Sequence, residues 1–309
     1  MKFSMKKFVK DFKRDWRLHL LVLVPTVHWI IFHYIPIYGI QIAFRDYRPK
    51  AGILHSEWVG LRWFKQFLAD PKFMEVFMNT VELSLYSFVT FPLPIIMALF
   101  LNAMRKEKYR KVVQTVSYMP HFISATVFVG IIDMLLSPVS GIYGSVFKLF
   151  GGQGYPVDFK GTAAAFSHIY IWSGVWQGLG WGTILYTAAL SSVSQELHEA
   201  ARIDGASRFK RIIHIDLPAI MPTIAIQLIM RVSGLLGVGF EKAYLMQTPL
   251  NLTVSEVIST YVYKKGMSSF RNFSYGAAVG MFSTVINVTL MIIANQISRK
   301  VSDNEVSFF

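Results

Sequence analysis

Apolar residues fill long, almost uninterrupted stretches of this chain instead of recurring on one face of short elements. Six stretches are long enough to cross a bilayer, namely 18–42, 80–104, 115–137, 163–190, 217–240 and 274–297. Backbone N–H and C=O groups in hydrocarbon must be satisfied within the segment, so each stretch is predicted to be a helix. The pattern therefore predicts an all-α polytopic membrane protein with a six-helix transmembrane domain over residues 18–297.

Polar segments flank this domain at both ends. In residues 1–17, Met5, Phe8 and Phe12 recur at helical spacing among lysines. This pattern is typical of an amphipathic helix on the inner membrane surface, and a disordered basic tail is the alternative. Residues 298–309 are predicted to form a short tail after the last span.

The composition agrees with membrane embedding. The 309 residues are 53% hydrophobic and 16% charged, with a mean hydropathy of +0.41. The absence of cysteine excludes disulfides, thiolate metal sites and a cysteine nucleophile. The net charge of +13 is compatible with nucleic acid, but the basic residues flank apolar stretches, where they contact anionic head groups. The lipid bilayer, and not nucleic acid, is therefore the expected partner.

Lysine and arginine also indicate an orientation. Residues 1–17 hold seven of them and the short loop 105–114 holds five. The loops expected on the opposite side hold twelve over a much greater length, namely 43–79, 138–162 and 241–273. Because basic residues are retained in the cytoplasm, both termini and the loop 191–216 are predicted to be cytoplasmic.

The outer loops carry aromatic residues. The segment 58–68 gathers Trp58, Trp63, Phe64 and Phe67. Anchoring at the membrane–water interface is the favoured interpretation, and a platform on which sugars stack is the alternative. The loop 241–273 is long and polar enough to form an external cap.

The loop 191–216 is unusual because it is charged and helix-like between two apolar runs. Either Ser192 with Gln195, as a capping box, or Ser194 is predicted to start a first helix. Gly205 is predicted to turn the chain in the left-handed conformation, and a second helical stretch then ends before Pro218. A rigid helix–turn–helix of this kind suits a docking element, and a solvated surface helix remains the alternative.

The same loop resembles the cytoplasmic "EAA" loop of permease subunits in binding-protein-dependent ABC importers. The match reads Glu-Ala-Ala, two residues, Asp-Gly-Ala, and then Ile-x-Leu-Pro with a proline four residues later. The residues that carry it are Glu199, Ala200, Ala201, Asp204, Gly205, Ala206, Ile215, Leu217, Pro218 and Pro222. The run FHYIPIYGIQIAFRDY (32–47) is most similar to permeases for oligosaccharides and polysaccharides in Gram-positive bacteria.

The resemblance implies the type I ABC importer permease fold and a set of partners. These are a second permease, expected to be a different chain, two ATPase subunits that bind ATP and Mg, an extracellular solute-binding protein and an oligosaccharide. The family also implies a position in the cytoplasmic membrane of a bacterium. Its coupling residues correspond to Glu199, Ala200, Ala201, Asp204, Gly205 and Ala206, with Glu199 facing a basic residue of the ATPase.

Motifs for chemistry are missing from the sequence. There is no P-loop, no His-Glu-x-x-His and no Gly-x-Ser-x-Gly. We therefore expect a transport subunit and not an enzyme, without catalytic residues, metal ligands or a cofactor of its own. The alternative function is an ion-coupled secondary sugar carrier, which would need internal repeats or a broken helix around an ion site. The sequence gives neither, and the ionisable residues in or beside spans offer weak support, namely Glu82, Asp133, Arg231 and Glu241.

Residues for the substrate path are expected from the resemblance to sugar permeases and from their side chains. They are Ser124, Trp176, Gln177, Gly178, Phe240 and Glu241. Glu241 departs from the family, where an asparagine would suit a neutral sugar. Gly174, Gly178 and Gly182 lie four apart, and close helix contact is the favoured explanation for this stripe.

Overall fold

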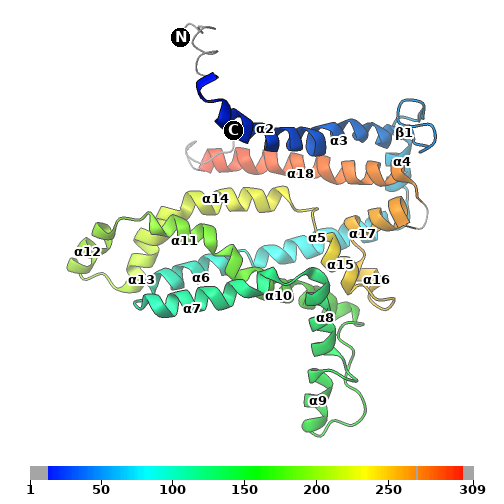
Figure 1. The fold of residues 1–309 in the computed structure, drawn as a ribbon. Coiled ribbons are helices and arrows are strands. Elements are labelled where there is room, and N and C mark those ends of the chain that lie inside the picture. Colours follow the sequence, from blue (N-terminus) through cyan, green and yellow to red (C-terminus); the bar gives the residue numbers. More distant parts are fainter. Residues whose placement is uncertain (1–12, 269–270, 302–309) are drawn as a thin grey trace.

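The computed structural model describes residues 13–268 and 271–301, and helices make up almost all of it (Figure 1). The first apolar stretch is one helical run with local π and 3₁₀ segments. Its elements are α2 (Trp16–Trp29), η1 (Ile30–Tyr34), α3 (Ile35–Ile37) and η2 (Tyr38–Phe44). A two-stranded antiparallel ribbon follows, formed by β1 (Arg45–Asp46) and β2 (Glu57–Trp58), in which Arg45 pairs with Trp58. The prediction for residues 1–12 lies outside the described residues.

The remaining elements are helices joined by short connections. They are α4 (Arg62–Leu68), α5 (Phe73–Val89), α6 (Pro92–Ala103), α7 (Glu107–Tyr118), η3 (Met119–Phe122), α8 (Ala125–Leu136), α9 (Ile142–Leu149), α10 (Ala163–Gly182), α11 (Ile184–Ser191), α12 (Gln195–Ile203), α13 (Arg208–Arg211), η4 (Ile212–Asp216), α14 (Leu217–Ser233), α15 (Phe240–Met246), α16 (Leu252–Ser255), α17 (Ile258–Val262), η5 (Tyr263–Ser268) and α18 (Phe273–Val301).

Most predicted spans correspond to long apolar helices. Among the described residues, four helices are long and apolar enough to cross a membrane, namely Trp16–Phe44, Phe73–Ala103, Arg208–Ser233 and Phe273–Lys300. A fifth candidate is the pair Glu107–Phe122 and Ala125–Leu136, if the two count as one span. The predicted span 163–190 is helical as α10 and α11, but it is not among the helices long and apolar enough to cross a membrane. The count of six spans is therefore not confirmed.

The predicted span 115–137 is not a single helix. Its two parts meet at an angle of 100°. Pro120 opens the short η3 turn, and Ser124 then caps α8 by accepting a hydrogen bond from the N–H of Val127 at 3.4 Å. Proline and a capping serine each interrupt the ladder of backbone hydrogen bonds, so the apolar run continues through a sharp bend.

The predicted end of the second helical stretch before Pro218 is wrong. α13, η4 and α14 form one helical run, Arg208–Ser233. The π segment Ile212–Asp216 directly precedes Pro218, which stands in the first turn of α14. A proline lacks the backbone N–H that an ordinary helix would use there, and a locally widened turn accommodates it.

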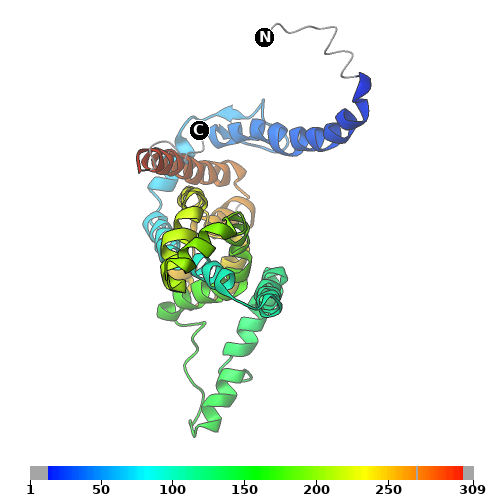
Figure 2. The same cartoon turned by 90° about the vertical axis from the view of Figure 1, so that its left-hand side faces the viewer.

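The long helices α5, α10, α14 and α18 run along one direction (Figure 1), and α18 packs against η2, the last part of the first helical run. The start of α2, the end of α18 and the helix α12 lie at the same end of the molecule (Figure 1). Figure 2 shows α2 extending away from α18 and from the rest of the molecule. α2 contains no buried residue, so its apolar surface is left to whatever surrounds this chain.

An aromatic core joins the segment 58–68, the segment 241–268 and the last span. Trp63 and Phe67 are buried against Tyr261 and Tyr275. Trp63 Nε1 donates to the carbonyl of Arg45 at 2.8 Å, and the Tyr261 and Tyr275 hydroxyls lie 2.8 Å apart. The prediction of interfacial anchoring is thus wrong for Trp63 and Phe67, which are core residues. Within loop 241–273, the elements α15, α16, α17 and η5 pack against the long helices.

A buried carboxylate links segments at the end of the molecule opposite α12 (Figure 1). Glu256 is 5% exposed and accepts hydrogen bonds from Lys72 Nζ at 2.9 Å and Lys264 Nζ at 2.8 Å. Burial alone would raise the pKa of Glu256, but the hydrogen bonds and charges of Lys264 and Lys72 hold it below its usual 4.5. The link joins the segment before α5 to the segment between α16 and α17.

Replacing Glu256 by glutamine should therefore destabilise the chain. A carboxylate whose pKa is lower in the folded than in the unfolded state contributes stability above about pH 4.5, and loses it as the pH falls through the folded value. Glu256→Gln should lower the unfolding free energy at pH 7 by about 2 kcal/mol. It should also flatten the decline of the melting temperature below about pH 4.5, measured in detergent.

Glu75→Gln is the matched control. Glu75 lies 4.0 Å from the same Lys72 but its side chain is 37% exposed, so its loss should have little effect. Equal melting temperatures for wild type and Glu256→Gln would contradict the stabilising role.

Candidate functional site

The loop between α11 and α14 carries the motif singled out in the sequence. Ser194 caps α12 by accepting from the N–H of Glu196 at 3.2 Å, which selects it over the capping box of Ser192 and Gln195. Ser207 caps α13 in the same way through the N–H of Lys210 at 3.3 Å. Two local caps therefore fix the two helices independently of tertiary contacts.

The turn between these helices is built by the Ala-Ala-x-x-Asp-Gly-Ala part of the motif. Gly205 has φ +74°, the left-handed conformation that the sequence predicts. The N–H of Ala206 donates to the carbonyl of Ala201 at 2.8 Å, and that of Gly205 to Arg202 at 3.0 Å. This pair of bonds is the Schellman motif, which satisfies the last carbonyls of a helix and needs glycine at the turn.

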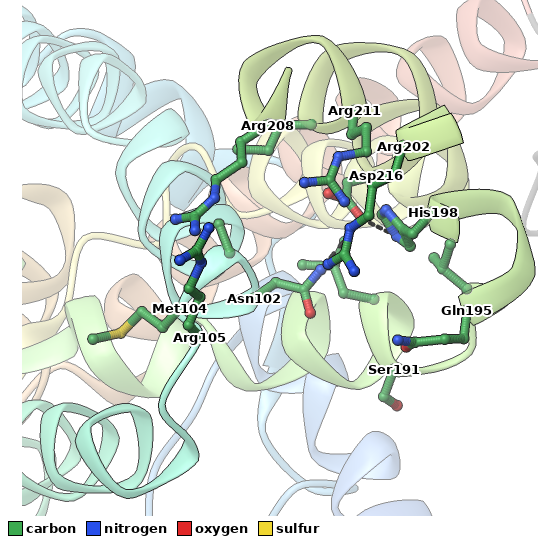
Figure 3. A pocket seen from close by; sticks show the side chains of 14 residues that line it. Asn102, Met104, Arg105, Ser191, Gln195, His198, Arg202, Arg208, Arg211 and Asp216 are labelled. Atoms are coloured by element: carbon green, nitrogen blue, oxygen red, sulfur yellow. Dashed lines mark hydrogen bonds and ion pairs between the residues drawn. The ribbon is translucent and has the colours of Figure 1, made fainter. Parts of the chain in front are cut away.

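A polar link ties α12 to the ends of the spans. His198 Nε2 lies 3.2 Å from Asp216 Oδ1, and Asn102 Nδ2 donates to the same oxygen at 3.2 Å (Figure 3). Asp216 is 3% exposed and stands at the start of α14, while Asn102 is near the end of α6. One buried carboxylate thus connects the loop helix to two long helices, and the sequence analysis did not single it out.

The outer surface of the loop is uncovered by the rest of the chain. Glu199, Ala200 and Asp204 are exposed. Two large apolar side chains beside them are also exposed, Ile203 at 88% and Phe209 at 71%. Apolar side chains displayed beside charges on a rigid turn mark a surface for contact with another protein.

A basic cleft adjoins the loop. It has a volume of about 740 Å³ and is lined by residues of the α6–α7 connection, α12 and α13. Arg105 and Arg208 reach toward each other across it, and Arg202 and Arg211 also point into it (Figure 3). The described lining contains one carboxylate, that of Asp216.

A second cavity of about 350 Å³ lies among α5, α6, α10, α14 and α15. Gln177 and Gly178 line it, as expected for the substrate path. Arg231 and Lys242 line it as well. Ser124, Trp176, Phe240 and Glu241 are absent from its described lining.

The expected path residues have identifiable contacts elsewhere. Gln177 Nε2 donates to the carbonyl of Ile123 at 3.0 Å, at the bend where α8 begins. Trp176 is 54% exposed and stacks on Phe128, and Phe240 stacks on Tyr244. The cap of α8, Ser124, and Glu241 are both exposed. The structure therefore brings only Gln177 and Gly178 of the six to one cavity.

The glycine stripe of α10 has several roles. A Cβ on Gly182 would lie 3.1 Å from Pro94 of α6, which is the close helix contact expected. A Cβ on Gly174 would instead lie 3.1 Å from Lys242 Nζ, and one on Gly178 would meet nothing within 4 Å. Close helix contact therefore explains Gly182, whereas Gly178 faces the open cavity.

Two other ionisable residues near spans, Asp133 and Glu82, contact polar side chains beside them. Asp133 pairs with Lys160 at 2.5 Å, and Glu82 accepts from Ser167 at 3.5 Å. No group of three or more His, Asp or Glu side chains that could hold a metal ion occurs within residues 13–268 and 271–301.

The sequence analysis missed Lys242 as a cavity residue. The sequence signal was the end of the apolar span 217–240. The helix α15 begins at this point, and its third residue, Lys242, lines the cavity, whereas Glu241 does not. Assigning Lys242 to the cavity requires the first residue of α15, and the hydropathy of the sequence does not give that residue.

Comparison with known proteins identifies relatives over nearly the whole chain. Protein LplB of Bacillus subtilis is 41% identical over 289 residues, covering 93% of this chain and 90% of that protein. The polygalacturonan/rhamnogalacturonan transport system permease protein YteP of the same species is 38% identical, covering 94% and 89%. A chain of the crystal structure of a bacterial alginate ABC transporter, in complex with alginate pentasaccharide-bound periplasmic protein, superposes with a TM-score of 0.84 at 35% identity, covering 96% and 98%.

A family model also matches residues 90–303, which include the Glu-Ala-Ala motif, the basic cleft and most of the cavity lining. Together with the relatives, it shows the fold class expected from the motif. The chain belongs to the family of binding-protein-dependent transport system inner membrane components.

Proposed function

We propose that this chain is one of two permease subunits in an ATP-driven importer of oligosaccharides or polysaccharide fragments. The observation that carries the proposal is the loop helix α12, which is capped, turned at Gly205 and exposed at its outer surface. Its partner is an ATPase subunit, whose cleft receives α12 and covers the apolar side chains of Ile203 and Phe209. Two copies of the ATPase bind ATP and Mg and drive the pair of permeases.

Two further protein partners complete the importer. A second permease, different from this chain, covers part of the exposed surface of α2 and closes the transport path. An extracellular solute-binding protein delivers the saccharide. The relatives support both, because one is named as the permease of a polygalacturonan/rhamnogalacturonan transport system and the solved transporter is described in complex with an alginate pentasaccharide-bound periplasmic protein.

The ion-coupled carrier is less well supported. The structure contains a broken helix at Ile123 and Ser124, which the sequence analysis did not expect, so this criterion alone no longer excludes a carrier. However, the carbonyl of Ile123 accepts from Gln177, and the described lining of the cavity contains no carboxylate. A coupling cation needs an acidic relay or oxygen ligands away from competing positive charge, whereas this cavity is lined by the cations Arg231 and Lys242.

Dependence on a separate motor is the first test of this proposal. The purified chain alone should show no ATPase activity above background, because its sequence contains no P-loop. Activity should appear with the ATPase subunits and the second permease, and rise further with loaded binding protein. Saccharide uptake into vesicles by this chain alone, driven by a proton or sodium gradient, would favour the carrier.

The turn at Gly205 gives a sharper test. Gly205→Val should strain the left-handed backbone by about 1–2 kcal/mol and misdirect α12. Gly205→Asn should largely retain function, because asparagine tolerates this conformation. Glu199→Lys should weaken the contact with a basic residue of the ATPase. Retention of the ATPase during purification and transport rate measure all three effects.

The control for these variants is Lys210→Ala, an exposed residue of α13. It should leave both measurements unchanged, and all variants should still insert and bind the second permease. If both Gly205→Val and Glu199→Lys transported normally, the loop would be a solvated surface helix and not a docking element.

The orientation is tested by thiol labelling, since the chain contains no cysteine. Lys210→Cys in the loop should resist a membrane-impermeant reagent in intact cells and react after permeabilisation. Ser268→Cys, which is exposed at the opposite end, should react in intact cells. Labelling of position 210 from outside would reverse the proposed topology.

A further inference from the structure

The cavity among α5, α6, α10, α14 and α15 holds a lysine without a carboxylate. Lys242 Nζ donates to the carbonyl of Tyr170 at 2.7 Å, and lies 4.7 Å from the Tyr170 ring centroid and 5.1 Å from that of Phe128. Gly174 permits this position, since a Cβ there would lie 3.1 Å from Nζ. A lysine ammonium has three donors, so two N–H groups are not used in this bond.

A second cation lines the same cavity from the end of α14. Arg231 Nη2 donates to the carbonyl of Ser87 at 2.7 Å. A guanidinium has five N–H donors in a planar fork that matches a carboxylate. Both cations thus contact neutral carbonyls of neighbouring helices and still have donors available at the cavity.

The cavity contains no opposite charge to balance them. Its described lining comprises two cations, several hydroxyl or amide side chains, glycines and apolar residues, and no carboxylate. Two like charges in an apolar surrounding oppose each other and are poorly solvated, so they are costly unless an anion joins them. Charged residues kept at such a place mark a functional site.

We propose that Lys242 and Arg231 form a subsite for the carboxylate of an acidic saccharide, so that the imported substrate contains uronic acid residues. The inference rests on the proposed import function and specifies its substrate class. Lys242 supplies a point charge, Arg231 supplies the planar fork, and the empty side of Gly178 gives room for the sugar ring. A neutral sugar would leave both cations without a counter-charge.

The test uses the complete transporter, with Gly178→Cys as a reporter inside the cavity. A Cβ at this position would meet no neighbour within 4 Å, and the chain has no other cysteine. An anionic methanethiosulfonate should react faster than a cationic one, by about tenfold, because two positive charges attract it. Trigalacturonate should protect the thiol, and its neutral methyl ester should not.

Two variants remove the charges separately, Lys242→Met and Arg231→Met. Each should lower the preference for the anionic reagent and abolish protection by trigalacturonate, while Lys242→Arg should retain both. The matched control is Lys65→Met, an exposed lysine of α4, which should behave like the parent.

Other outcomes overturn the inference in distinct ways. Equal reaction of the anionic and cationic reagents would show that a residue of the second permease already neutralises the cations. Equal protection by trigalacturonate and its ester would remove the requirement for charge, and would leave oligosaccharide import intact. Failure of the wild-type transporter to take up any saccharide under ATP would contradict the proposed function itself, and the labelling assay does not depend on that uptake.

Discussion

The need to satisfy every backbone polar group inside a bilayer is the constraint on which this structure depends. Within a long helix the backbone groups bond to one another. Where a helix ends, its unpaired N–H and C=O groups must bond to side chains. At the bend after η3, the carbonyl of Ile123 accepts from Gln177. At the break after α14, the carbonyl of Leu235 accepts from Ser84, and the N–H of Leu236 donates to Asn287 Oδ1 at 3.0 Å. Irregular backbone at this depth is tolerated where other helices supply partners or a cavity opens, and both conditions hold here.

The same long helices connect the loop helix α12 to the cavity. Asp216 begins α14 and binds His198 of α12, while Arg231 lies near the end of α14 and lines the cavity. α6 repeats this arrangement, with Asn102 bonded to Asp216 and Pro94 at the cavity. A displacement of α12 would therefore act on two rigid helices whose far ends shape the cavity. The carboxylate of Asp216 is the physical joint between the two regions.

Much of this architecture could be predicted from the sequence, because span length and the coupling motif are local properties. The left-handed Gly205 and the cap at the start of α12 follow from residue types at fixed spacing. The bend at Ser124 was missed because the apolar run continues through it, and hydropathy does not record direction. Trp63 and Phe67 were assigned to the interface because an outer loop was assumed to be exposed, whereas Tyr261 and Tyr275 bury them.

The cavity explains why only Gln177 and Gly178 of the six path residues expected from the sequence line it. Gln177 was chosen for its amide, but its nitrogen closes the broken backbone at Ile123, so part of its hydrogen-bonding capacity serves the fold. Lys242 and Arg231 each make one bond to a carbonyl and have several further donors. A side chain can therefore bind a solute only if it has hydrogen-bond donors or acceptors that the backbone does not already use. Polarity alone does not show this. Counting that capacity requires the positions of the helix breaks, and these are set by contacts between residues far apart in the chain.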